Sequence, residues 1–297
     1  MESHFTAGFI GFGLIAGSMA KAMKKNCSCT ILATSRHLEP LYRAQKDGVL
    51  DYVLNDIYDK QEPSHADFST CDIIFISTPV VTICSYLEKL KDIVKQTCII
   101  TDVGSVKNSI YKTAIDCGLS SNYIGGHPMA GSETSGYDNS DEKIIKDACY
   151  VIVPTKDSNQ EQIDFYKNLM LEIGFRVEIM DSETHDKAVA GISHATHLIS
   201  ATLAKTVAES DIEPAMRSLI STGFIDTTRI AASSPEMWSQ ICLSNSDAIV
   251  DFLDDYLEKL KAVRDSVSQA TISPESTSKA IEDLFTQAGE YRSKILK

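Results

Sequence analysis

The sequence places one histidine in a motif suited to acid–base chemistry. His127 lies in Gly125-Gly126-His127-Pro128-Met129-Ala130-Gly131, between a glycine pair and a proline. These neighbours restrict the local backbone and hold the imidazole in one direction. An imidazole has an ordinary pKa of about 6.5, so it can exchange a proton at neutral pH. The motif predicts that His127 is a rigidly held catalytic group, and alone it leaves a structural hydrogen-bonding role open.

A glycine turn near the N-terminus predicts a dinucleotide site. The apolar run Phe5 to Ile10 leads into Gly11-Phe12-Gly13-Leu14-Ile15-Ala16-Gly17-Ser18, after which apolar residues continue at helical spacing. Such a turn lets the backbone approach a pyrophosphate and directs the positive end of a helix at its charge. The residues predicted to contact the cofactor here are Gly11, Gly13, Leu14 and Ile15.

The end of the next strand bears on the choice between NAD and NADP. An acidic residue usually binds the ribose hydroxyl of NAD at this point, but the predicted strand Thr30 to Thr34 is followed by Ser35-Arg36-His37. A hydroxyl beside a guanidinium suits a 2′-phosphate, because arginine donates in a rigid fork and no carboxylate repels the anion. NADP is therefore favoured over NAD, and stacking of Arg36 on adenine in an NAD site is the alternative.

Apolar strands alternate with amphipathic helices through the first half of the chain. Asp72 to Ser77 and Cys98 to Asp102 predict buried strands of an α/β fold, a doubly wound Rossmann-type parallel sheet in a domain of residues 1–181. Ligands bind at the carboxyl ends of such strands. Ser105 lies at one of these ends, either as a helix N-cap or facing the nicotinamide. The further residues predicted to line the cofactor are Ser77, Thr78, Pro79 and Gly104.

The second half, residues 182–297, has only helical patterns and predicts an all-α domain. Its first helix is expected from Ser182 to about Ala208. At about 100° per residue, this helix brings one carboxylate, one small residue, one hydroxyl and one imidazole to a single face. The face predicts a pocket wall, with a polar contact between helices as the alternative. Its residues are Asp186, Ala190, Ser193 and His197.

Arg229, Trp238 and two long helices are the other informative features of this half. Arg229 has apolar neighbours, so we expect it to be buried against an internal carboxylate or an anionic substrate. Trp238 is expected to be a packing anchor. Amphipathic patterns over residues 248–267 and 276–295 predict long helices that form a dimer interface or a simple bundle.

Composition limits the classes of function. A net charge of −13 over 297 residues argues against binding to nucleic acid or to an anionic membrane. No apolar run is long enough to span a membrane. The sequence has eight cysteines but neither a Cys-x-x-Cys pair nor a signal peptide. These features predict free thiols and a cytoplasmic protein. His194 and His197 are spaced for a metal, but no third ligand is in register, so no metal site is predicted.

Six motifs, in this order, resemble those of the prephenate dehydrogenase family, which includes the arogenate and cyclohexadienyl dehydrogenases of tyrosine biosynthesis. The resemblance covers nearly the whole chain. It rests on Gly11 to Ser18, Ser77-Thr78-Pro79, Asp102 to Lys107, Gly125 to Gly131, Ser193 to His197 and Asp226 to Ala231.

The resemblance implies a reaction and a role for several residues. Prephenate would be oxidatively decarboxylated to 4-hydroxyphenylpyruvate, with hydride transfer to NAD(P), and arogenate is the alternative substrate. His127 would accept the proton of the ring hydroxyl, and Ser105 would help to position both groups. A homodimer through the helical domain is also expected. Arg229 would bind the ring carboxylate, and the further substrate contacts would be His197, Ser193 and Glu133 in the polar rim after His127.

Two departures from the family pattern and two other functions are considered. Ser35-Arg36 replaces the usual acidic residue, and the chain ends at Lys297 without the regulatory domain that some members carry, so any tyrosine inhibition is expected at the active site. A 3-hydroxyacid dehydrogenase would use a helix lysine such as Lys187 or Lys205, neither of which explains His127. A non-catalytic NADP-binding sensor would need only the glycine turn and the apolar helices.

Overall fold

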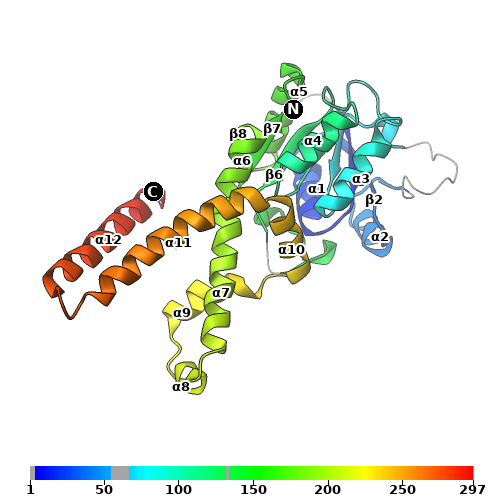
Figure 1. The fold of residues 1–297 in the computed structure, drawn as a ribbon. Helices are drawn as coiled ribbons and strands as arrows, with labels where there is room; N and C mark the ends of the chain where they lie inside the picture. Colours follow the sequence, from blue (N-terminus) through cyan, green and yellow to red (C-terminus); the bar gives the residue numbers. More distant parts are fainter. Residues whose placement is uncertain (1–3, 55–66, 132–133, 297) are drawn as a thin grey trace. The chain divides into compact units, whose positions relative to one another are not determined.

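A five-stranded parallel sheet forms the centre of the N-terminal half (Figure 1). The computed structural model describes residues 4–54, 67–131 and 134–296. The strand order is β3-β2-β1-β4-β5, and each of these neighbouring pairs is parallel. The predicted Rossmann-type sheet is therefore confirmed. The strands are β1 (Phe5–Ile10), β2 (Cys29–Thr34), β3 (Tyr52–Val53), β4 (Ile73–Ile76) and β5 (Ile99–Asp102).

Helices cover both faces of this sheet. They are α1 (Leu14–Asn26), α2 (Glu39–Lys46), α3 (Val80–Leu90), α4 (Asn108–Asp116) and α5 (Gln160–Glu172). Successive side chains of a strand point to opposite faces. Phe9 and Phe75 accordingly pack in a cluster that includes residues of α1, α2 and α5. Ile10 and Ile76 pack in a second cluster, which includes residues of α3 and α4. Burial on both faces explains why the strands are apolar throughout.

A second, three-stranded sheet carries His127. Its strands are β6 (Ile124–Pro128), β7 (Cys149–Pro154) and β8 (Arg176–Ile179). β6 and β7 are antiparallel, whereas β7 and β8 are parallel. One parallel bridge between Ile100 and Tyr123 connects this sheet to the first. Short 3₁₀ turns lie at Phe68–Thr70, Tyr137–Asn139 and Glu142–Ile144.

Helices follow β8, and those up to residue 246 pack with the sheets in one compact unit. They are α6 (Ser182–Val189), α7 (Thr196–Ala208), α8 (Glu213–Ser218), α9 (Thr222–Thr228) and α10 (Pro235–Ser244). A π-helical segment, Ala190–Ala195, separates α6 from α7, and a 3₁₀ turn, Arg229–Ala232, follows α9. The helix expected from Ser182 to Ala208 therefore contains a wider turn. α6 packs against α4, and α10 packs against α3.

The last two helices form a second compact unit, residues 247–297. They are α11 (Ser246–Ser268) and α12 (Pro274–Ile295), close to the two ranges expected from the sequence. No residue of α12 within the described range is buried. The division by packing at residue 246 differs from the boundary after residue 181 that the change from strands to helices predicts, and the latter stays a prediction. Among the described residues, none of the helices has the length and hydropathy needed to cross a bilayer.

Candidate functional site

Gly11 is required by both its backbone conformation and its packing. Its φ of 83° lies in the left-handed region, and a Cβ there would lie 2.4 Å from the carbonyl oxygen of Ser77. The amide of Gly11 donates to the carbonyl oxygen of Thr34 at 2.8 Å, and the amide of Ser77 donates to that of Ile10 at 2.7 Å. Glycine at this position therefore brings the ends of β1, β2 and β4 together.

The start of α1 fits the phosphates of a dinucleotide. Gly13 is the N-cap residue, and within the described part of the chain no side chain caps the helix and no acidic residue occupies its first turn. A Cβ on Gly13 would meet no atom within 4 Å, so a ligand can approach the backbone closely. The amides near Leu14 and Ile15 and the positive end of the helix therefore suit an anion.

Two buried hydroxyl groups near this turn fit a ligand as well. Oγ1 of Thr34 and Oγ1 of Thr78 are buried, and neither has a hydrogen-bond partner among the described residues. Thr34 is the last residue of β2, and Thr78 comes two residues after the end of β4. Each is next to a half-buried serine, Ser35 and Ser77 respectively. Buried hydroxyl groups normally have a partner, so a bound cofactor would complete these contacts. Pro79 and Arg36 are exposed at the same edge, and Gly104 is buried after β5.

His127 lies inside β6, which pairs with β7 in the antiparallel direction. Neither Gly125 nor Gly126 has a positive φ. A Cβ on Gly126 would instead lie 2.4 Å from the hydroxyl oxygens of both Tyr150 and Tyr166. The glycines thus allow close packing behind the strand rather than an unusual backbone conformation. That packing leaves the His127 side chain in a fixed place with 8% exposure.

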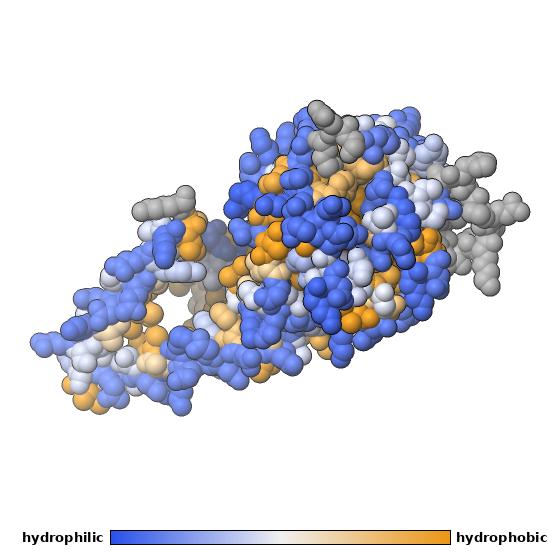
Figure 2. Space-filling model, turned by 90° about the horizontal axis from the view of Figure 1, so that it is seen from above, coloured by the Kyte–Doolittle hydropathy of each residue, from blue (hydrophilic) through white to orange (hydrophobic). Residues whose placement is uncertain are grey.

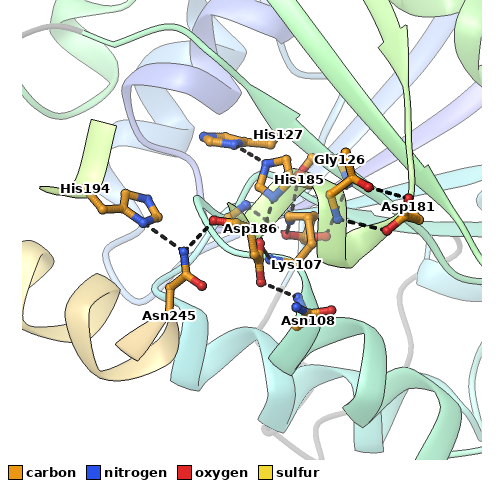
Figure 3. A network of polar contacts seen from close by, with 12 residues as sticks. Lys107, Asn108, Gly126, His127, Asp181, His185, Asp186, His194 and Asn245 are labelled. Atoms are coloured by element: carbon orange, nitrogen blue, oxygen red, sulfur yellow. Dashed lines mark hydrogen bonds and ion pairs between the residues drawn. The ribbon is translucent and has the colours of Figure 1, made fainter. Parts of the chain in front are cut away.

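A chain of buried polar side chains connects His127 to α6 (Figure 3). Nδ1 of His127 lies 2.8 Å from Nε2 of His185. Nδ1 of His185 in turn lies 2.7 Å from Oδ1 of Asp186. Burial lowers the pKa of His127 well below its usual value, and the charges that His185, Lys107 and His194 can carry lower it further. The imidazole is therefore neutral near pH 7, which is the form that can accept a proton.

The loop after β5 is fixed by two buried carboxylates. Asp186 accepts the amide of Lys107 at 2.8 Å and the amide of Asn108, at the start of α4, at 2.9 Å. The ammonium of Lys107 forms an ion pair with Asp102 and donates to the carbonyl oxygen of Gly126 at 2.8 Å. Lys107 and Asp102 are fully buried. These bonds hold the loop 102–108, the strand with His127 and the helix with His185 together.

Asp102 has further partners that account for its burial. It accepts the hydroxyl of Tyr123 at 2.7 Å and the amide of Gly104 at 2.8 Å. Burial lowers the pKa of Lys107, while the Asp102 carboxylate acts in the opposite direction. The ion pair connects the end of β5 to Lys107, and the bond from Lys107 to the carbonyl oxygen of Gly126 connects it to β6 in the second sheet.

Ser105 lies in this loop and is half-buried. Lys107, not Ser105, is the N-cap residue of α4, and the side chain that accepts the amides at the start of this helix is that of Asp186. The helix-cap alternative for Ser105 is therefore wrong. Its predicted contact with the nicotinamide and the substrate hydroxyl stays a prediction.

His197 lines a separate cavity between helices. Its ring stacks on Trp238 with a centroid distance of 3.8 Å, and its Nδ1 lies 2.8 Å from the carbonyl oxygen of Ser193. Nε1 of Trp238 is buried without a hydrogen-bond partner among the described residues. The cavity has a volume of about 220 Å³ and is lined by His197, Leu198, Ala201, Ile230, Ala231, Ser233, Pro235 and Trp238. Trp238 is thus a wall of a cavity as well as a packing residue.

The single face expected for Asp186, Ser193 and His197 does not form. Asp186 is buried toward α4, whereas His197 faces the cavity beside Trp238. The π-helical segment between them adds a wider turn and changes which residues align. His194 takes the place next to Asp186 instead, because Nδ2 of Asn245 contacts Nδ1 of His194 at 3.1 Å and donates to the Asp186 carbonyl oxygen at 2.9 Å.

His194 connects the two groups of polar residues. Its ring lies edge-on to Trp238 with a centroid distance of 6.0 Å. Burial lowers its pKa to about 4, partly offset by the Asp186 carboxylate. The contacts run from His127 through Asp186, Asn245 and His194 to the wall of the cavity. The site around His127 and the cavity around His197 are therefore parts of one continuous arrangement.

The remaining residues predicted to bind the substrate differ in how exposed they are. Arg229 begins the 3₁₀ turn and is exposed, so the expectation that it is buried is wrong. Its neighbours Ile230 and Ala231 provide the apolar contacts and line the cavity instead. Ser193 is half-buried. Glu133 lies outside the described residues, and the substrate roles of Arg229, Ser193 and His197 stay predictions.

Four residues of this arrangement were not singled out for a role in the site from the sequence. Lys107 and Asp102 lie in the motif Asp102 to Lys107, but their ion pair depends on the conformation of the loop after β5. His185 lies in α6, outside the helix face that the regular period predicts for the site. Asn245 lies beyond α10 in a polar stretch with no distinctive pattern. Only the pairing of segments far apart in the sequence identifies them.

A glycine-turn dinucleotide fold with a buried neutral histidine next to its sheet edge defines an oxidoreductase that uses NAD(P). The family description "Prephenate dehydrogenase, nucleotide-binding domain" matches residues 19–179, and "Prephenate dehydrogenase, dimerization domain" matches residues 181–284. The chain belongs to the prephenate dehydrogenase family.

Curated relatives and solved structures agree with this assignment. The chain is 34% identical to the prephenate dehydrogenase of Bacillus subtilis over 87% of this chain and 69% of that protein. It is 30% identical to the cyclohexadienyl dehydrogenase of Zymomonas mobilis over 87% of each. The crystal structure of Synechocystis arogenate dehydrogenase has a TM-score of 0.84 and 30% identity, covering 98% of this chain and 99% of that one. Prephenate dehydrogenase from A. aeolicus, in complex with hydroxyphenyl propionate and NAD+, has a TM-score of 0.86 and 26% identity, covering 97% and 99%.

Proposed function

We propose that this protein is a prephenate dehydrogenase, which oxidatively decarboxylates prephenate to 4-hydroxyphenylpyruvate with NAD(P). The observation that carries the proposal is His127: it is buried, and a second imidazole, that of His185, lies 2.8 Å from its Nδ1. Within the described part of the chain, no protein group bonds to its other ring nitrogen, Nε2. A general base for a ring hydroxyl needs this combination of a neutral ring, a fixed orientation and a free nitrogen.

Cofactor binding and proton transfer are assigned to different parts of the chain. The glycine turn and the start of α1 bind the cofactor, which supplies a hydride acceptor when bound. His127 accepts the hydroxyl proton on Nε2 while the carbon that bears the hydroxyl loses its hydride. The bond from the ring to its carboxylate then breaks, carbon dioxide leaves, and the electron pair enters the ring, which becomes aromatic. The proton returns from His127 to the phenolate oxygen, which gives the phenol product and regenerates the neutral imidazole.

Steady-state rates with prephenate and with arogenate, each with NAD and with NADP, test this proposal. Prephenate is expected to have the highest kcat/KM. Turnover of arogenate alone would assign the alternative substrate, which the similarity to the Synechocystis structure supports. Absence of turnover with both substrates, for a folded protein that binds the cofactor, would overturn the proposal.

We further propose that the enzyme prefers NADP. Ser35 and the exposed Arg36 follow β2, at the position where an acidic residue would select NAD. Replacing Arg36 by alanine is expected to raise KM for NADP by about 10- to 150-fold, because a charge-assisted hydrogen bond contributes about 1.5–3 kcal/mol. KM for NAD should change little. Titration of both cofactors measures this change. Equal changes for the two cofactors would indicate stacking on adenine, and Arg264→Ala in α11 is the matched control.

Arg229 is proposed to bind the ring carboxylate, since Ile230 next to it lines the cavity with His197. Arg229→Ala is expected to weaken substrate binding by about 1.5–3 kcal/mol, the contribution of a hydrogen bond to a charged group. KM for the substrate should rise about 10- to 150-fold while cofactor binding is unchanged. Arg217→Ala, an exposed arginine of α8, is the control. An unchanged KM would assign Arg229 a structural role.

A homodimer through the helical part is also proposed. The second family description contains the words "dimerization domain" and covers α6 to α11. Large apolar side chains are exposed on α11 and α12, and Figure 2 shows hydrophobic residues among hydrophilic ones on the surface of the molecule. Exposed apolar patches of this kind support an interface between copies. The exposed apolar side chains include Leu257, Leu260, Phe285 and Tyr291.

A cytoplasmic location is also proposed. The eight free cysteines support it, because disulfides are rare in that compartment.

A further inference from the structure

We propose that His185 and Asp186 are positioning residues that keep the proton of His127 on Nδ1 and so leave Nε2 as the base. The inference rests on the proposed function, because it gives His127 the same role. It goes further by assigning a direction to each hydrogen bond in the chain of buried side chains that Figure 3 shows.

The direction starts at Asp186. Its Oδ1 accepts the amide of Lys107, and its Oδ2 accepts the amide of Asn108. Backbone amides can only donate, so both carboxylate oxygens are acceptors. The position at the start of α4 also favours a negative charge. Nδ1 of His185, 2.7 Å from Oδ1, must therefore carry the hydrogen of that bond.

The hydrogen bond between His185 and Asp186 also determines which ring nitrogen of His127 carries its hydrogen. A neutral imidazole has one N–H and one acceptor nitrogen. With its hydrogen on Nδ1, His185 presents a lone pair on Nε2, and the nitrogen 2.8 Å away, Nδ1 of His127, must donate to it. Nε2 of His127 is left without a hydrogen. The opposite direction would place the hydrogen on Nε2 and make that nitrogen unable to accept the hydroxyl proton.

The same arrangement stabilises His127 after it accepts the proton. The imidazolium keeps its Nδ1–H bond to His185, and the Asp186 carboxylate lies beyond that ring. This is the way in which the aspartate of a serine-hydrolase triad orients its histidine without taking the proton. Lys107 has the opposite effect, because its positive charge lowers the pKa of His127. The Asp186 carboxylate beyond His185 opposes this positive charge, while the direction of the two hydrogen bonds selects the tautomer.

The kinetic test uses three variants and one control. His185→Phe keeps the volume but removes the acceptor, and kcat is expected to fall about 10- to 100-fold with KM for the substrate changed less than about 2-fold. His185→Gln retains a carbonyl acceptor and should recover part of kcat. Asp186→Asn can donate to His185 and reverse the direction, so kcat should fall by a similar factor. Asp181→Asn changes the N-cap residue of α6 but leaves the hydrogen bonds among His127, His185 and Asp186 in place. It therefore controls for loss of helix stability.

A measurement without turnover separates this inference from the proposed function. Two-bond ¹H–¹⁵N spectra of the histidine rings in the wild-type protein report which nitrogen carries hydrogen. The inference expects Nδ1–H for both His127 and His185 in the wild type and a shift of His127 toward Nε2–H in folded Asp186→Asn. An Nε2–H form of wild-type His127, or full kcat in His185→Phe, would overturn it. Inactivity of the wild type with the expected tautomers would overturn only the proposed function.

Discussion

Replacing His127 by alanine is expected to lower kcat by about 10²-fold or more while NAD(P) binding is retained. The substitution removes the proposed acceptor for the hydroxyl proton, whereas the glycine turn proposed to bind the cofactor lies between β1 and α1. The cavity beside His197 is also left in place, so KM for the substrate should change less than kcat. Aromatisation still favours the overall reaction, which is why a residual rate is expected rather than none.

Steady-state kinetics and cofactor titration of the purified variant measure this effect. His4→Ala is the matched control, because His4 bonds to Ser28 and Thr30 at the opposite end of β2. Near-normal turnover of His127→Ala would remove the assignment of this residue as the base. A joint loss of turnover and cofactor binding would point to misfolding, which circular dichroism detects.

Replacing Lys107 by methionine is expected to lower the free energy of unfolding by about 3–5 kcal/mol. Methionine has a similar volume, but it leaves the Asp102 carboxylate fully buried without its cation. It also removes the hydrogen bond to the carbonyl oxygen of Gly126, next to His127. Denaturant unfolding monitored by circular dichroism measures the change, and kcat should decrease as well because the strand of His127 loses a support.

A double variant separates the charge from the packing. Lys107→Met combined with Asp102→Leu removes both charges, and replacing a buried ion pair by apolar groups is often neutral. The double variant is therefore expected to be more stable than Lys107→Met alone. If both are equally unstable, the unpaired carboxylate does not explain the effect, and the loss of the Asp102 bonds to Tyr123 and Gly104 accounts for the instability of the double variant.

The sequence alone determined the parts of the protein whose signals are local. A strand, a glycine turn and a helix are adjacent along the chain, and the left-handed conformation of Gly11 can be met only by glycine without strain. The alternation of apolar strands and helices likewise predicted the doubly wound sheet. For the same reason the long helices near the C-terminus were placed within a few residues.

The tertiary structure decided the features that depend on distant or irregular segments. His127 and His185 are 58 residues apart, and their pairing follows from the packing of α6 against α4 and from the bonds of Lys107 to both Asp186 and Gly126. A π-helical segment changed the helix face that a regular period had predicted, and it brought His194, not Ser193, next to Asp186. Arg229 is exposed although its neighbours are apolar, because they line a cavity on the other side of the turn.

The motif around His127 combines both kinds of information. Its residue types identified a catalytic candidate from the sequence. The tertiary structure shows that Gly126 accommodates the hydroxyl groups of Tyr150 and Tyr166 behind the strand. A histidine motif can mark a base, whereas the nitrogen that acts as the base depends on hydrogen bonds from residues that only folding brings near, here His185 and Asp186.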